Sequence, residues 1–147
     1  MAMAERRAEC VWEGDLVHGS GCVSVDSGAF SEFPVTWASR TERSNGKTSP
    51  EELIAAAHAS CFSMALSGAL AEAGTPPERL KVHAKATLDA VEAGLRITTM
   101  DLEVWGRVPG LDLDGFLKAA QGAKTGCPVS NALTGVDISL KAYLEED

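Results

Sequence analysis

The stretch S-P-E-E-L-I-A-A-A-H-A-S-C-F-S-M-A-L-S-G-A-L-A-E, residues 49–72, predicts the longest helix of the chain. Ser49 is suited to cap its start, Pro50 suits the first helical position, and Glu52 completes a capping box. After this first turn no formal charge appears before Glu72. A helix that is apolar nearly all round is usually buried, so we expect a central helix with other elements packed on several sides.

Alternating apolar and polar residues predict strands before and after this helix. These strands are expected at residues 8–14, 21–26, 34–39, 81–89, 95–108 and 136–144. An amphipathic helix is expected at 112–124 and a short helical turn at 129–133. The order β-β-β-α-β-β-α-β predicts an α+β fold, with antiparallel sheets around buried helices, in a single domain of residues 1–147.

Composition limits the classes of partner. The chain carries 21 acidic and 13 basic side chains, a net charge of −8, with no basic run, so we expect no nucleic-acid partner. No uninterrupted apolar run approaches the ~20 residues of a membrane span, and the start M-A-M-A-E-R-R lacks the apolar core of a signal peptide. We therefore expect no membrane association and a cytoplasmic location.

Four cysteines are present, and no two of them form a C-x-x-C pair. This spacing does not favour a structural metal, and permanent disulfides are not expected in the cytosol, which leaves burial or redox chemistry. Cys10 and Cys22 lie on predicted strands whose same-face neighbours include no acid or base, so both are interpreted as structural.

Cys61 and Cys127 each allow two interpretations. Cys61 lies in the middle of the long helix, where a free cysteine is commonly core packing but can also be a redox centre. Cys127 precedes Pro128, which places it near the start of a short helix. Unpaired backbone N–H groups there can lower a thiol pKa, so Cys127 is either a small turn residue or a reactive thiol.

Three charged or titratable side chains could serve such a thiol. Arg40, at the end of a predicted strand, is held better than Arg43 and could supply the fixed cation that a thiolate needs. Glu51 either interacts favourably with the helix dipole or orients an arginine. It is ten residues from Cys61, about 15 Å along a helix, so a second subunit would have to bring it there. His58 could be a base for Cys61 or a buried histidine bonded to backbone.

Four segments together resemble the OsmC family of the OsmC/Ohr superfamily of thiol peroxidases. They are W-E-G-D (12–15), S-G-C-V-S-V-D-S-G (20–28), the stretch from Ser49 to Leu66, and G-C-P-V-S (126–130). The resemblance covers nearly the whole chain, in order. It implies an intertwined homodimer with two active sites at the interface. In each site Cys61 would be the peroxidatic cysteine and Cys127 the resolving one.

The resemblance also places the family's arginine and glutamate on Arg40 and Glu51. In the Ohr branch an arginine follows the first strand, whereas here L-V-H-G-S-G offers His18 and no arginine, which favours the OsmC branch. The implied activity is reduction of hydroperoxides to alcohols through a Cys61 sulfenic acid and an intramolecular Cys61–Cys127 disulfide, in defence against oxidative stress. No cofactor is implied, but an external dithiol reductant, small or protein, is required.

The apolar residues Ile54, Phe62 and Met64 near Cys61 favour organic hydroperoxides over hydrogen peroxide. Two other classes of function remain open from the residues alone. One is a thiol redox sensor or a dimer that binds small apolar ligands without turnover. The other is a purely structural dimer.

Overall fold

A computed structural model describes residues 1–146, and the chain forms two compact units, Met1–Leu53 and Ile54–Asp147. Its strands are β1 (Ala8–Glu13), β2 (Ser20–Val25), β3 (Phe33–Val35), β4 (Arg79–Val91), β5 (Gly94–Arg107) and β6 (Asp137–Leu144). Its helices are α1 (Trp37–Thr41), α2 (Pro50–Glu72), α3 (Leu113–Gly126) and α4 (Pro128–Ala132). The predicted α+β class is confirmed, and the order of the elements is compatible with the prediction.

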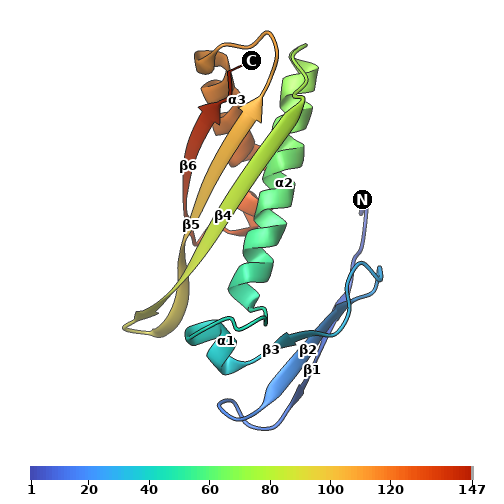
Figure 1. The fold of residues 1–147 in the computed structure, drawn as a ribbon, viewed down its shortest axis with the longest axis vertical. Helices are drawn as coiled ribbons and strands as arrows, with labels where there is room; N and C mark the ends of the chain where they lie inside the picture. The colour runs from blue at the N-terminus through green and yellow to red at the C-terminus, as the bar shows by residue number, and fades with distance from the viewer. Residues whose placement is uncertain (147) are drawn as a thin grey trace. The chain divides into compact units, whose positions relative to one another are not determined.

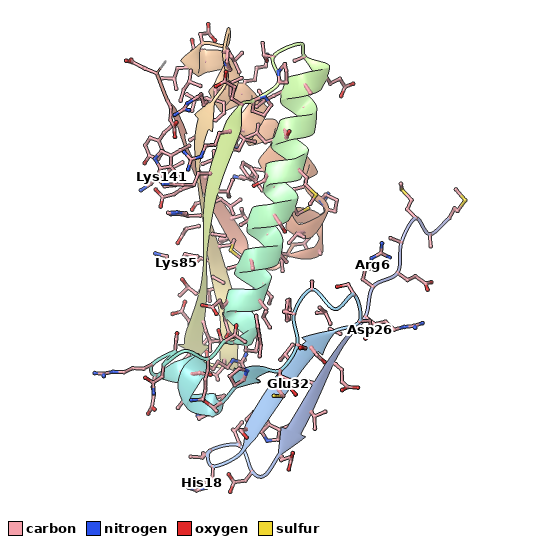
Figure 2. The ribbon with its side chains drawn as sticks, turned by 45° about the vertical axis from the view of Figure 1, so that its right-hand side comes forward. Arg6, His18, Asp26, Glu32, Lys85 and Lys141 are labelled. Atoms are coloured by element: carbon pink, nitrogen blue, oxygen red, sulfur yellow. The ribbon has the colours of Figure 1, made fainter. Side chains whose placement is uncertain are left out.

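In the first unit, β1, β2 and β3 form an antiparallel meander, as the alternation predicts. His18 lies at the tip of the β1–β2 hairpin (Figure 2), where its backbone N–H donates to Asp15 Oδ1 at 2.7 Å. The prediction of a strand through residue 39 is wrong, because β3 ends at Val35 and α1 follows. Thr36 and Ser39 form a reciprocal capping box, which starts a helix in spite of the alternating sequence.

The second unit is built on the sheet β4-β5-β6. Strands β4 and β5 pair antiparallel, whereas β5 and β6 pair parallel, so the prediction of wholly antiparallel sheets is wrong here. The reason is the long connection through α3 and α4, which returns the chain to the same end of the sheet. Figure 1 shows α2 running lengthwise along this sheet.

The core of the second unit lies between the sheet and the helices. Helix α2 contributes residues four apart, strand β5 contributes residues two apart, and α3 adds one face, as the helical and strand periods require. These fully buried side chains are Phe62, Leu66, Leu70, Met100, Leu102, Val104, Phe116 and Ala120. Gly106 on β5 leaves room for the Phe116 ring, because a Cβ there would overlap it. The opposite face of the sheet is charged, and Figure 2 shows Lys85 and Lys141 pointing away from α2.

Helix α2 is not buried on all sides within the single chain. Its buried positions follow one stripe through His58, Phe62, Leu66 and Leu70, while Met64 on another face is 73% exposed. The predicted burial all round is therefore wrong for the protomer. The sequence hides this sidedness, because the exposed face also consists of small or apolar residues.

By length and composition, α2 is the one helix among residues 1–146 that could cross a membrane. The expectation concerned an uninterrupted apolar run, and α2 is interrupted by polar residues such as His58 and Ser60. One stripe of α2 packs against the sheet of the second unit, but only 22% of its apolar window is buried in the protomer.

Candidate active site

The two thiols singled out from the sequence lie together in the second unit. Cys61 projects from the middle of α2 and Cys127 from the junction of α3 and α4, and their Sγ atoms are 2.9 Å apart. Both are free thiols, Cys127 fully buried and Cys61 partly buried. A disulfide needs about 2.05 Å between the sulfurs, so a small movement suffices for these two residues to bond.

The chain holds Cys127 by its backbone on both sides. Its N–H donates to Ala123 O at 2.9 Å, which ends α3, and its carbonyl accepts from Asn131 N–H at 3.1 Å, which begins α4. Pro128 occupies the first position of α4, where its missing N–H has no cost. The predicted place of Cys127 at the start of a short helix is confirmed, and this anchoring fixes the direction of its side chain.

His58 makes a contact that the sequence interpretation missed. Its ring is fully buried, and Nε2 lies 2.8 Å from Oγ of Ser130, which is also buried. Nδ1 has no hydrogen-bond partner within residues 1–146. His58 is thus bonded neither to Cys61 nor to a backbone group. Ser130 stands three residues after Cys127 in G-C-P-V-S, and that one-turn spacing was the available signal.

The surroundings of the two thiols shift their pKa values in opposite directions. Burial raises the pKa of the Cys61 thiol, and its hydrogen bond with Cys127 raises it further. Burial also acts to raise the pKa of Cys127, but the hydrogen bond with Cys61, the N–H groups of Ser130 and Val129 and the Ser130 hydroxyl outweigh it. The net pKa of Cys127 is therefore below its ordinary value. Within this unit, the surroundings therefore favour negative charge on Cys127 more than on Cys61.

Arg40 and Glu51 form an ion pair within the first unit. Glu51 Oε1 accepts from Arg40 Nε at 2.9 Å and lies 2.8 Å from Nη2. Arg40 belongs to α1 and not to the end of a strand, and it stands 5.9 Å from the centroid of the Trp37 ring. Glu51, in the first turn of α2, is 7% exposed, and its Oε2 has no partner within residues 1–146. The four predicted site residues thus form two pairs, one in each unit.

The other sequence candidates take part in neither pair. Cys10 and Cys22 are exposed. Cys10 on β1 pairs with Val23 on β2, the residue next to Cys22, so the two cysteines point to opposite faces of that sheet. Phe62 is fully buried in the core, so it is not available to line a substrate site as expected. Among residues 1–146, no group of three or more His, Cys, Asp or Glu side chains is arranged to hold a metal.

These features define an α+β protein with a pair of free thiols in contact, one on its long helix and one on a turn between helices. Its fold is shared by the organic hydroperoxide resistance protein OsmC of Legionella pneumophila, with a TM-score of 0.74 and 23% identity over 97% of this chain and 99% of that one. It is also shared by OhrB of Bacillus subtilis, with a TM-score of 0.69 and 23% identity over 95% and 98% of the two chains.

Sequence similarity identifies the family. Residues 43–141 match the family described as OsmC-like protein. The chain is 44% identical to Peroxiredoxin OsmC of Escherichia coli (strain K12) over 140 residues, which cover 93% of this chain and 97% of that protein. The chain belongs to the OsmC-like family.

Proposed function

We propose that this protein is a thiol-dependent peroxidase that reduces hydroperoxides, preferably organic ones, to alcohols and so defends the cell against oxidative stress. The observation that carries the proposal is the 2.9 Å approach of the Cys61 and Cys127 sulfurs. The names of its relatives, Peroxiredoxin OsmC and organic hydroperoxide resistance proteins, support the reaction and the organic substrate class.

In the first step the Cys61 thiolate attacks the hydroperoxide oxygen that carries the hydrogen. The O–O bond breaks, the alkoxide leaves and takes up a proton, and Cys61 becomes a sulfenic acid. In the second step Cys127 attacks the Cys61 sulfur, the S–O bond breaks, and water leaves as the disulfide forms. An external dithiol then reduces the disulfide by exchange, and no cofactor takes part.

In this mechanism Arg40 supplies the positive charge that Cys61 lacks, and Glu51 orients the guanidinium. The raised pKa of Cys61 is the reason that a cation is required. Glu51 and Cys61 are separated by ten residues of α2, about 15 Å along the helix. A second copy of the chain would therefore bring its Arg40–Glu51 pair to Cys61, in an intertwined homodimer with two sites.

The same proposal includes a single domain of residues 1–147 and a cytoplasmic location.

The test is hydroperoxide consumption by purified protein in the presence of a dithiol, with mass spectrometry of the oxidised chain. The wild type should consume cumene hydroperoxide faster than hydrogen peroxide and form a Cys61–Cys127 bridge. Cys61→Ser should abolish consumption, Cys127→Ser should allow one oxidation but no cycle, and the matched controls Cys10→Ser and Cys22→Ser should behave as wild type. A wild-type protein that forms the bridge without turnover would instead be a redox sensor.

A further inference from the structure

Two side-chain contacts join α2 to the start of α4. On α2, His58 and Cys61 are three residues apart, so their side chains are neighbours on the helix surface. Cys127 and Ser130 are likewise separated by three residues at the start of α4. The two sulfurs are 2.9 Å apart, and His58 Nε2 lies 2.8 Å from Ser130 Oγ. The hydrogen bond between histidine and serine therefore joins the same two elements as the thiol contact.

Both partners of this hydrogen bond are buried, with His58 0% exposed and Ser130 8% exposed. Nδ1 has no hydrogen-bond partner within residues 1–146, so the bond to Ser130 is the only hydrogen bond of the ring in that part of the chain. Burial lowers the pKa of His58, and the ring is therefore neutral at pH 7. Burial also keeps solvent from competing for the bond, so removal of one partner leaves the other unsatisfied.

The position of α4 on α2 depends on contacts of this kind. Residues Pro128–Ala132 form little more than one turn, which is too short to be stable as an isolated helix. Ser130 is at the centre of this turn, and Cys127 immediately precedes it. A disulfide needs the two sulfurs to come closer by less than about 1 Å, so a small shift of α4 decides whether they can bond. A hydrogen bond from the middle of α4 to α2 is well placed to limit that shift.

We propose that the His58–Ser130 hydrogen bond is a clasp that fixes α4 on α2 and so sets the rate and the equilibrium of closing the Cys61–Cys127 disulfide. The inference rests on the proposed peroxidase function. His58 and Ser130 are positioning residues in it. In the step that they serve, the Cys127 sulfur attacks the sulfur of the Cys61 sulfenic acid, the S–S bond forms and the S–O bond breaks. The leaving hydroxide takes up the Cys127 proton, and water is released.

The clasp predicts that loss of either partner affects disulfide formation and not the attack of Cys61 on the hydroperoxide. His58→Leu and Ser130→Ala should each slow disulfide formation about tenfold, the effect of leaving a buried group without its hydrogen bond. The double variant should lose no more than the more affected single variant, because both changes remove the same bond. His58→Gln places an N–H donor at a similar distance from the backbone and should recover much of the rate.

Two measurements test these expectations in a chain with Cys10 and Cys22 replaced by serine. In the first, one equivalent of cumene hydroperoxide is added in a rapid-mixing instrument without reductant. Hydroperoxide loss in a Cys127→Ser background gives the rate of the first step, and quenched mass spectrometry of the chain with Cys61 and Cys127 gives the rate of disulfide formation. In the second, equilibration with reduced and oxidised glutathione gives the equilibrium constant of the disulfide. It should fall by a similar factor, because without the clasp α4 occupies positions in which the sulfurs are apart.

Ser60→Ala on α2 and His83→Leu on β4 change exposed residues of the same types and are matched controls that should leave both rates and the equilibrium unchanged. Wild-type values of disulfide formation and equilibrium in folded Ser130→Ala would overturn the clasp. Equal losses in His58→Leu and His58→Gln, losses that add in the double variant, or equal slowing of the first step would also overturn it, because a general packing defect would then explain them. If His58→Leu does not fold, Ser130→Ala and His58→Gln decide alone.

The clasp and the proposed function can fail separately. Wild-type protein that consumes no hydroperoxide refutes the proposed function, while the equilibrium with glutathione, which needs no hydroperoxide, still tests the clasp. Normal turnover of the wild type, together with wild-type values for Ser130→Ala in both measurements, refutes only the clasp.

Discussion

At the scale of single residues, the surroundings of Cys61 and Cys127 differ in how well they stabilise a negative charge. Glu51 is buried and uses one carboxylate oxygen to bind Arg40, while its other oxygen has no hydrogen-bond partner within residues 1–146. The Cys61 thiol has its pKa raised by burial, and the stabilising N–H groups act mainly on Cys127. In the proposed mechanism Cys61 therefore depends on the Arg40 cation, because its own surroundings do not favour the thiolate.

Arg40→Met should lower the rate constant of Cys61 oxidation about 100-fold at pH 7, the typical effect of removing one group that stabilises developing charge. The loss should shrink as pH rises, because without the cation the pKa of Cys61 lies higher still and more alkaline solution is needed to form the thiolate. The measurement is single-turnover hydroperoxide consumption between pH 6 and 10. Arg43→Met, in the exposed loop, is the control, and an equal effect of both variants would remove Arg40 from the mechanism.

At the scale of elements, α2 has two faces with different roles. The stripe through Phe62, Leu66 and Leu70 packs under the sheet, and the same stripe carries His58 toward Ser130. Packing and chemistry are thus coupled, because the contacts that hold α2 on the sheet also set the position of Cys61 against Cys127. The face with Met64 is exposed in the part of the protomer that the structure describes.

Phe62→Ala should lower the free energy of unfolding by about 3–5 kcal/mol, because it removes a fully buried ring and leaves a cavity. Met64→Ala is the matched control within the same turn of α2 and should cost much less in the isolated protomer, since that side chain is 73% exposed. Urea unfolding at a protein concentration low enough to dissociate any dimer gives both values. Similar losses in the two variants would mean that the packing of α2 is not as described.

At the scale of the whole molecule, two features favour a homodimer. One is the exposed face of α2, and the other is the ten residues of helix between Glu51 and Cys61. Small or apolar residues line this face, including Ala56, Ala57, Met64 and Gly68, and no large patch of this kind is expected to stay in water. A second copy of the chain would cover it and would bring an Arg40–Glu51 pair to each thiol pair. The proposed dimer thus serves both burial and catalysis.

Met64→Glu should weaken self-association by at least tenfold in Kd, because it places a charge in an apolar interface, while the protomer keeps its secondary structure. Sedimentation equilibrium measures the association and circular dichroism the fold. Peroxidase activity should fall with the fraction of dimer and recover at high protein concentration. A monomeric wild type, or an active monomeric variant, would contradict an active site shared between copies.

The sequence by itself determined the features that depend on neighbouring residues: the long helix after Ser49, most of the strands, the helical turn at Cys127, and the motifs that carry the family resemblance. Capping boxes and alternation are local, so they can be recognised along the chain. Even there, the Thr36–Ser39 box was missed beneath an alternating pattern, and a helix stands where a longer strand was predicted.

The tertiary structure alone decided which residues meet and which faces remain open. Cys61 and Cys127 are 66 positions apart and His58 and Ser130 are 72 apart, so no local period relates them. The parallel pairing of β6 depends on the path of α3 and α4, and the sidedness of α2 depends on the sheet beneath it. These features arise from long-range packing, in which residues of similar polarity are distinguished only by the surface they contact.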